Sequence, residues 1–327
     1  MIYPWQQSQW QNVQQQQQTD RLPHALLLIG SQGLGKLDFA RQLAESLLCQ
    51  NLQVEGDAGG QPCGKCAACK LLAAATHPDL FILQAEEPGK AIKVDDVRQL
   101  SARLNLTSQY GGARVALLVD AHDMNMNAAN SLLKTLEEPA AGTIIILVSS
   151  FPQKLPVTVR SRCQCVFFRE PDTAQALSWM NAQGVVSSEA TALLSMAHGA
   201  PLLAMNLQHS ELSSYHRQLV SALLAMIKKT SVVEQAEQLH KLPLPSLLGW
   251  LYDWIQDLIK LQQCGDTVKL VNEAHKADLQ QLVTRCRLAD LYEYLDQLAK
   301  SRQLQSFPLN SQLLWEDLLL SWSRLIK

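Results

Sequence analysis

Short uninterrupted runs of apolar residues alternate along the first half of the chain with segments in which apolar residues recur at helical spacing. Runs without a polar break are typical of strands that are buried on both faces of a parallel sheet. The predicted strands are residues 25–29, 79–83, 113–120, 143–148 and 164–168. Amphipathic helices are predicted at residues 37–48, 94–106 and 130–139. This alternation predicts an α/β domain with a parallel sheet and helices on both of its faces.

The pattern changes near residue 171, after which no further strand is predicted. Helices are predicted at residues 172–183, 187–198, 244–261 and 288–298. We therefore predict three domains: an α/β domain over residues 1–168, a small helical domain over 169–209 and an all-α domain over 210–327. Four tryptophans of the last domain are expected to pack in a core or an interface: Trp250, Trp254, Trp315 and Trp322.

The composition excludes several classes of protein. Apolar residues make up 47% of the 327 residues and the formal net charge is −2, so no overall basic field holds nucleic acid. The start, MIYPWQQSQW, has no basic segment leading into an apolar run, and no stretch is long and apolar enough to span a bilayer. We expect a cytoplasmic protein whose eight cysteines are reduced unless they hold metal.

Glutamine dominates residues 5–18 and forms an unbroken run from Gln14 to Gln18. This bias indicates no chemistry of its own. We predict a solvated helix here.

A glycine-rich segment joins the first predicted strand to the helix that follows it. The sequence GSQGLGK, which begins at Gly30, fits the GxxxxGK part of a phosphate-binding loop. Gly33 and Gly35 also allow backbone N–H groups to turn toward an anion, and Lys36 would contact the outer phosphates. The next residue is Leu37, where the motif requires Ser or Thr to hold magnesium. We predict a degenerate nucleotide site, with a glycine-rich turn that binds nothing as the alternative.

A carboxylate ends another predicted strand. Asp120 stands where phosphate-loop ATPases hold magnesium, often through water. In those enzymes a second acidic residue beside it positions the attacking water, and this chain has Ala121 there. We assign Asp120 to the degenerate nucleotide site and expect no hydrolytic base, with a simple turn or cap residue as the alternative.

Four of the eight cysteines lie in one short segment: Cys49, Cys63, Cys66 and Cys69. The last three form two consecutive CxxC spacings, and two residues between cysteines let both sulfurs face one ion. The intervening residues GDAGGQP are typical of a loop that lets the segment fold back. We predict a structural zinc knuckle inserted in the α/β domain. An iron–sulfur cluster and unligated thiols are the alternatives.

These residues together resemble the clamp-loader branch of the AAA+ ATPases, and within it the delta-prime family of bacterial DNA polymerase III. The resemblance covers nearly the full length. Its specific parts are GSQGLGK, the cysteine knuckle, THPD at Thr76–Asp79, NSLLKTLEEP at Asn130–Pro139 and SRC at Ser161–Cys163. It implies a AAA+-like α/β domain, a small helical lid domain and a helical collar domain for oligomerisation.

The SRC segment carries the most specific implication of this resemblance. In the family it bears an arginine finger that reaches into the ATP site of the neighbouring subunit, which assigns that role to Arg162. For an arginine considered alone, an ion pair at the domain edge is the alternative. Leu202 stands where motor subunits have a nucleotide-sensing arginine. With Leu37 and Ala121, this departure implies a subunit that does not hydrolyse ATP, although Lys36 leaves the binding of ATP or ADP open.

The resemblance further implies a hetero-pentameric ring with delta and gamma/tau subunits, which loads the sliding beta clamp onto primed DNA and has no membrane partner. Two other classes remain open. An active motor ATPase of the gamma/tau type is disfavoured by Leu37 and Ala121. A DNA-binding protein that uses the cysteine site as a finger is disfavoured because the knuckle has few basic residues, Lys65 and Lys70, and no clear recognition helix.

Overall fold

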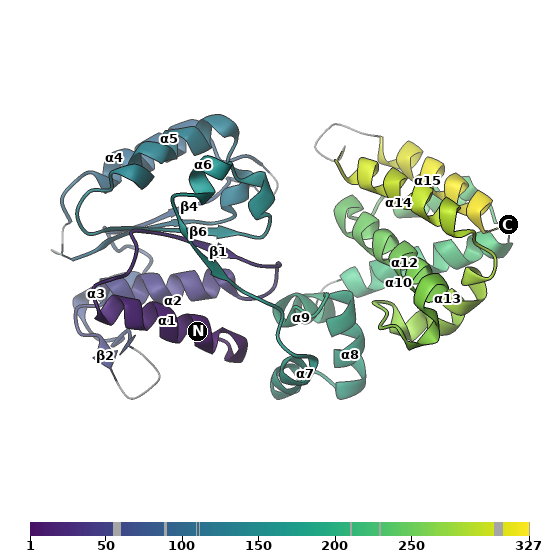
Figure 1. Cartoon of the computed structure of the whole chain (residues 1–327), viewed down its shortest axis with the longest axis horizontal. Coiled ribbons are helices and arrows are strands. Elements are labelled where there is room, and N and C mark those ends of the chain that lie inside the picture. The colour runs from purple at the N-terminus through teal and green to yellow at the C-terminus, as the bar shows by residue number, and fades with distance from the viewer. Residues whose placement is uncertain are drawn as a thin grey trace. The chain divides into compact units, whose positions relative to one another are not determined.

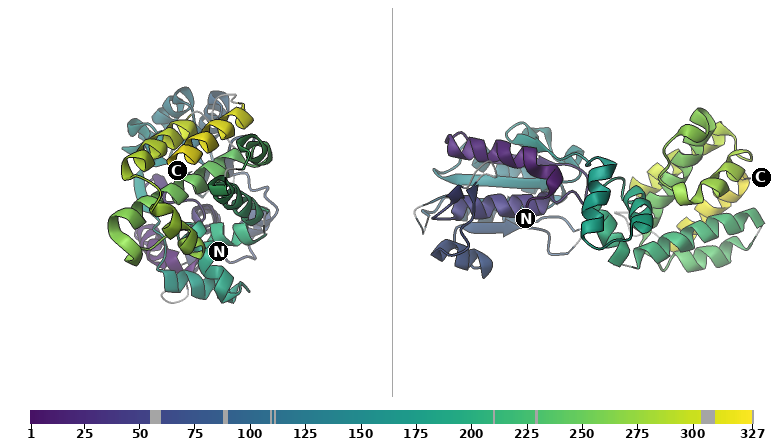
Figure 2. Two further views of the ribbon diagram at one scale, coloured as in Figure 1. Left: turned by 90° about the vertical axis from the view of Figure 1, so that its right-hand side faces the viewer. Right: turned by 90° about the horizontal axis from the view of Figure 1, so that it is seen from below.

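The computed structural model describes residues 1–54, 60–87, 90–108, 110, 112–209, 211–228, 230–303 and 310–326. The chain divides into two units, Met1–Gln175 and Ala176–Lys327 (Figure 1). The first unit contains the sheet, and the described residues of the second unit form helices without strands (Figure 2). The division of the helical region into a lid domain and a collar domain stays a prediction.

Five parallel strands form the sheet, in the order β4-β5-β6-β1-β7. The strands are β1 Ala25–Ile29, β4 Leu80–Leu83, β5 Arg114–Leu118, β6 Thr143–Ser149 and β7 Gln164–Phe167. In strand β1, which lies between β6 and β7, Leu27 lies opposite Leu147 on one side and Cys165 on the other. The expected α/β class with a parallel sheet is confirmed. Because parallel strands share one carboxyl edge, the segments after β1, β5 and β6 meet there.

Helices cover both faces of this sheet (Figure 1). The helices of the first unit are η1 Pro4–Gln6, α1 Gln7–Gln18, α2 Lys36–Leu48, α3 Ala67–Ala73, α4 Val94–Leu104, η3 Ala121–Asp123, α5 Met126–Glu137, η4 Pro152–Lys154 and α6 Val157–Arg160. On the face covered by α4 and α5, Val97 and Leu132 join Leu27 in one buried cluster. On the face covered by α2, Phe39 and Leu43 are fully buried. Burial on both faces explains the uninterrupted apolar runs.

The glutamine-rich segment forms helix α1 as predicted, and the expectation of a solvated helix holds for one side of it only. Trp10 is buried and packs edge-on against Phe39, with 5.4 Å between the ring centroids. Gln14 is also buried, and its Oε1 accepts a hydrogen bond from the backbone N–H of Gly60 at 2.8 Å. Tertiary contacts that composition does not report therefore cover one side of this helix.

The cysteine-rich segment begins where α2 ends. Its elements are the antiparallel strands β2 Gln53–Val54 and β3 Gly60–Gln61, followed by α3 Ala67–Ala73. Residues 56–59 of the predicted GDAGGQP loop lie outside the described residues, whereas Gly60 and Gln61 belong to a strand. That part of the loop prediction is wrong, because backbone pairing with β2 orders these two residues.

Leucine-rich helices build the second unit. The helices after the sheet are α7 Thr173–Ala182, α8 Ser187–Met196, α9 Pro201–His209, α10 Leu212–Ala225, η5 Met226–Lys228, α11 Val232–Leu239, α12 Leu244–Cys264, η6 Gly265–Thr267, η7 Glu273–His275, α13 Lys276–Val283, α14 Leu288–Gln303 and α15 Ser311–Leu325. Trp254, Trp315 and Trp322 are almost completely buried, and Trp250 is 8% exposed. The prediction that these rings pack in a core is confirmed.

Of the helices that the structure describes, none is by itself long and apolar enough to cross a bilayer. One pair of helices, Glu189–Met196 and Pro201–Gln208, is long and apolar enough only when both are counted together, and the two helices are bent by 114° at the break between them.

Candidate functional site

The phosphate loop connects β1 to α2, and the lysine that ends it turns back onto the loop itself. Nζ of Lys36 donates to the backbone oxygens of Gly30 at 2.7 Å and Ser31 at 2.6 Å, and to Oγ of Ser150 at 3.1 Å. An ammonium group has three N–H donors, so these bonds engage all of them. Only 4% of Lys36 is exposed. In this arrangement the lysine stabilises the loop instead of presenting its charge to a ligand.

Carboxylates lie near this lysine, although no ion pair with it occurs among the described residues. Burial lowers the pKa of Lys36 to about 8, and the charges of Asp120 and Glu170 act in the opposite direction. Glu170 also accepts a hydrogen bond from Oγ of Ser31 at 2.5 Å. Asp120 follows β5 at an exposed position with a φ of 47°. The structure thus brings the predicted residues Lys36 and Asp120 to the same edge of the sheet.

The first residues of the chain cover the phosphate loop, an arrangement that no motif in the sequence predicted. Nε1 of Trp5 and Nε2 of Gln6 both donate to the backbone oxygen of Leu34, at 3.0 Å and 2.8 Å. Gly35 has a φ of +78°, and a Cβ atom at this position would lie 2.5 Å from the ring of Tyr3. Only glycine therefore fits here. The aromatic residues near the start were the one available signal, because large apolar side chains are usually buried.

The other predicted glycines also lie in this loop. Gly33 has a φ of +80°, which favours glycine. Gly30 lies against the backbone of Phe168, the residue that follows β7. A Cβ atom added at position 30 would lie 2.4 Å from the carbonyl oxygen of Phe168. These glycines satisfy the local packing of the loop whether or not an anion binds.

The structure shows how two departures from the motor pattern are accommodated. Leu37 occupies the first turn of α2 with an apolar side chain, where a magnesium-binding hydroxyl would be needed. Ala121 is fully buried and belongs to the cluster that includes Leu118 and Met124. Position 121 therefore packs in the core and holds no water-positioning carboxylate. Leu202 lies in α9 of the second unit, and its proposed relation to the loop stays a prediction.

Arg162 lies in the connection between α6 and the edge strand β7, with 34% of its side chain exposed. Its Nε donates to Oε1 of Glu137 at 2.7 Å, and its Nη2 contacts the same oxygen. Its Nη1 donates to the backbone oxygen of Thr158 at 2.9 Å. The ion pair considered above as the alternative is therefore present in the single chain. The finger role stays a prediction, because it concerns a neighbouring subunit.

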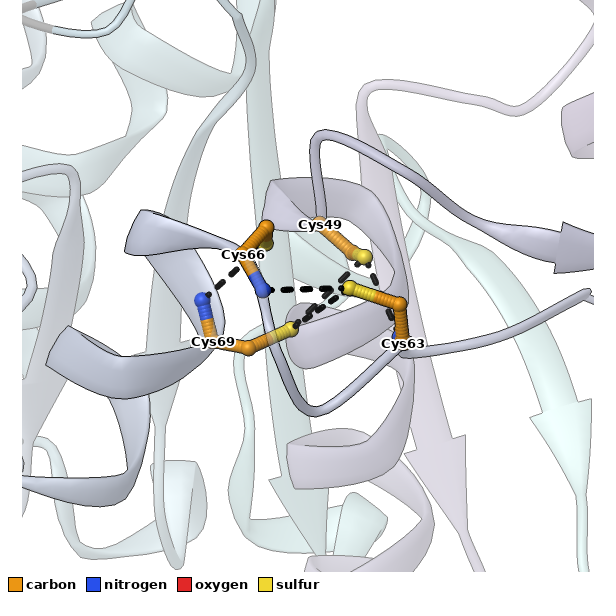
Figure 3. A group of neighbouring side chains, drawn as sticks. All are labelled: Cys49, Cys63, Cys66 and Cys69. Carbon is orange, nitrogen blue, oxygen red and sulfur yellow. Dashed lines mark hydrogen bonds between the residues drawn. The ribbon is translucent and has the colours of Figure 1, made fainter.

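The four clustered cysteines converge on one point (Figure 3). Cys49 follows the end of α2, Cys63 and Cys66 lie in the turn that precedes α3, and Cys69 lies in its first turn. All four sulfur atoms lie within 4.8 Å of one another, with 3.6 Å between Cys49 and Cys69 and 3.9 Å between Cys63 and Cys69. The sequence-predicted ligand set is thus brought together by the fold.

The spacing of these sulfurs fits zinc. Zinc–thiolate bonds of about 2.3 Å in a tetrahedron separate the sulfurs by roughly 3.8 Å. Backbone N–H groups also point at the sulfurs: Cys63 N donates to Cys49 Sγ at 3.3 Å, and Cys69 N donates to Cys66 Sγ at 3.3 Å. Such donors stabilise thiolates, which are the form that binds metal. No other group of metal-ligating side chains of this kind occurs in the part of the chain that the structure describes.

The chain is similar to known proteins over nearly its full length. A family model described as "DNA polymerase III, delta subunit" matches residues 5–172, and one described as "DNA polymerase III, delta subunit, C terminal" matches residues 210–324. The chain is 37% identical to DNA polymerase III subunit delta' of Pseudomonas aeruginosa, covering 99% of this chain and 98% of that protein. It is 35% identical to the subunit delta' of Yersinia pestis, covering 98% of this chain and 95% of the relative.

A more limited similarity extends to another subunit type. DNA polymerase III subunit tau/gamma of Haemophilus influenzae is 34% identical over 184 residues, which are 55% of this chain and 26% of that protein. The delta' subunits of Pseudomonas aeruginosa and Yersinia pestis, by contrast, match this chain over nearly their full length. This chain belongs to the delta' subunit family of DNA polymerase III.

Proposed function

We propose that this chain is a non-motor subunit of the bacterial replicative clamp loader. It assembles in the cytoplasm with delta and gamma/tau subunits into a five-membered ring that loads the sliding beta clamp onto primed DNA. The observation that carries the proposal is the phosphate loop, in which Lys36 donates all three N–H groups internally and Leu37 supplies no magnesium ligand. Membership of the delta' family supports the identity of the complex.

In this role the chain contributes to catalysis in a neighbour and not in its own loop. Phosphoryl transfer depends mainly on positioning and on stabilising charge on the transferred group. The guanidinium of Arg162 is permanently charged and presents a planar set of donors that suits phosphate oxygens. Its position beside the edge strand β7, with a third of the side chain exposed, supports donation to an adjacent ATP site.

Cys49, Cys63, Cys66 and Cys69 are the ligands of a structural zinc ion in this role. When bound, zinc would join the end of α2 to the start of α3. The degenerate nucleotide site binds ATP or ADP weakly or not at all. Its residues are Gly30, Gly33, Gly35, Lys36 and Asp120.

The isolated chain is expected to show no measurable ATP hydrolysis and weak or absent ATP binding. Replacing Leu37 with Thr should restore one magnesium contact and tighten Mg–ATP binding by roughly tenfold, the equivalent of one charge-assisted hydrogen bond. Turnover should stay near zero because Ala121 leaves the attacking water unpositioned. Calorimetric titration and a steady-state ATPase assay test both points, with Leu37→Ala as a control that adds no magnesium ligand. Robust hydrolysis by the unmodified chain would contradict the non-motor assignment.

Reconstitution tests the function itself. The chain is mixed with delta and gamma/tau subunits, the mass of the complex is measured by native mass spectrometry, and clamp loading is followed on primed DNA. We expect one copy per five-membered ring and loading that depends on its presence. Failure to enter a complex, or equal loading without it, would overturn the proposal.

An active motor of the gamma/tau type remains the second candidate. It is favoured by the retained Lys36 and by the similarity to the tau/gamma relative. The ATPase assay on the isolated chain separates the two candidates, because only a motor would turn over ATP.

A further inference from the structure

The contacts of Arg162 engage one edge of its guanidinium and leave another edge open. Nε and Nη2, which form the side of the planar group, both contact Oε1 of Glu137. Nη1 donates one hydrogen to the backbone oxygen of Thr158 at 2.9 Å. A guanidinium carries five N–H bonds, so one remains on Nη1 and one on Nη2. Within the described part of the chain no acceptor is bonded to these two.

Nη1 and Nη2, which each keep one N–H bond, are the two nitrogens of the terminal edge of the guanidinium, the edge that binds two phosphate oxygens at once. The side-on contact with Glu137 therefore does not compete with phosphate binding. It fixes the plane of the group and restricts its rotation, while Thr158 anchors the opposite nitrogen. With 34% of the Arg162 side chain exposed, a group from another molecule can approach it.

Glu137 is not explained by the stability of its own helix. It is the last residue of α5, where the negative end of the helix dipole disfavours a carboxylate, and Glu138 adds a second negative charge next to it. Its side chain is 49% exposed, and ion pairs at such positions contribute little to folding. The carboxylate of Glu137 contacts Arg162 from a helix position that is electrostatically unfavourable. This cost without a gain in stability indicates that the contact has a function.

We propose that Glu137 is a positioning residue for Arg162. Its carboxylate holds the guanidinium side-on, so that the terminal fork faces the γ-phosphate in the neighbouring subunit. The inference rests on the proposed function, since it requires that Arg162 acts in trans. Orientation of a catalytic group contributes to the rate because misplacement by about 1 Å costs up to roughly 100-fold.

The test uses rings reconstituted with this chain carrying Glu137→Gln, Arg162→Ala or both, and measures clamp-stimulated ATPase as kcat and KM. Glutamine keeps an acceptor oxygen but loses the charge. We expect Glu137→Gln to lower the Arg162-dependent part of kcat by about 3- to 10-fold with KM for ATP changed less than twofold, since positioning acts in the transition state. In the Arg162→Ala background it should cause no further loss.

Glu138→Gln is the matched control, because it removes an exposed carboxylate from the adjacent position of the same segment. It should leave kcat unchanged. If Arg162→Ala has no effect on turnover, the finger assignment itself fails, and the inference about Glu137 fails with it. If Arg162→Ala lowers kcat but Glu137→Gln does not, or raises it, only the positioning role is overturned. A loss from Glu137→Gln that persists in the Arg162→Ala background would show a structural role and overturn it too.

Discussion

Rings that contain Arg162→Ala are expected to assemble normally and to show a depressed clamp-stimulated ATPase and slower clamp loading. An arginine finger contributes roughly 10³- to 10⁵-fold to the rate at its own site, or about 4–7 kcal/mol of barrier. The loss per ring should be smaller than this range, because only one of several ATP sites depends on this chain. Arg162→Lys should restore little, because lysine keeps the charge but lacks the planar fork.

The stability of the chain provides the complementary measurement. The Arg162–Glu137 pair is partly exposed on both sides, and such pairs contribute about 0–1 kcal/mol. Losing it should lower the melting temperature of this chain by no more than roughly 2–4 °C. Arg169→Ala, at an exposed position of the same unit, is the control and should change neither quantity. A large drop in melting temperature with unchanged turnover would identify Arg162 as a structural ion pair and defeat the finger assignment.

The purified chain is expected to contain one tightly held zinc ion, which Cys63→Ser or Cys66→Ser releases. Structural zinc binds zinc-finger peptides with an apparent free energy of about 10–16 kcal/mol near pH 7, and this binding is coupled to folding, so the loss of zinc should unfold the knuckle. The five strands contribute no ligand, so the sheet should survive. The disturbance should reach α1, because Gln14 accepts a hydrogen bond from Gly60 beside the knuckle.

Elemental analysis and amide hydrogen exchange test this prediction together. Exchange should accelerate over the knuckle and α1 and stay slow in the buried strands. Cys264→Ser is the control, because Cys264 is exposed in the second unit and belongs to no metal-ligating group in the described chain. A preparation without metal, or one with an iron chromophore, would contradict the zinc assignment.

Local sequence patterns were sufficient for the architecture of the first unit. Apolar runs such as Ala25–Ile29 predict buried strands because each residue of the strand meets a helix layer, whichever face it points to. The order of the strands in the sheet was not predictable from these local patterns. That β1 lies between β6 and β7 depends on pairing between segments more than 100 residues apart, which periodicity does not encode.

In the candidate sites, too, local geometry was predictable from the sequence and contacts between distant segments were not. The spacing of Cys63, Cys66 and Cys69 predicts a common ligand centre, because CxxC geometry is local. The contacts of Lys36 with Ser150 and of Leu34 with Trp5 and Gln6 were not predictable, since they join distant parts of the chain. The partly buried character of α1 was missed for the same reason.

The amino-acid sequence alone established which chemical groups this protein has and which it lacks: a phosphate loop without its hydroxyl at Leu37, a strand end without its second acid at Ala121, a set of four thiols and an arginine at 162. These are facts of residue identity at fixed spacing. Only the tertiary structure decided what each group contacts. Packing against the start of the chain covers the phosphate loop, and the approach of α5 to the segment before β7 pairs Arg162 with Glu137. Such pairings follow from the packing of whole elements, because the free energy of each contact is realised only when both elements are in position.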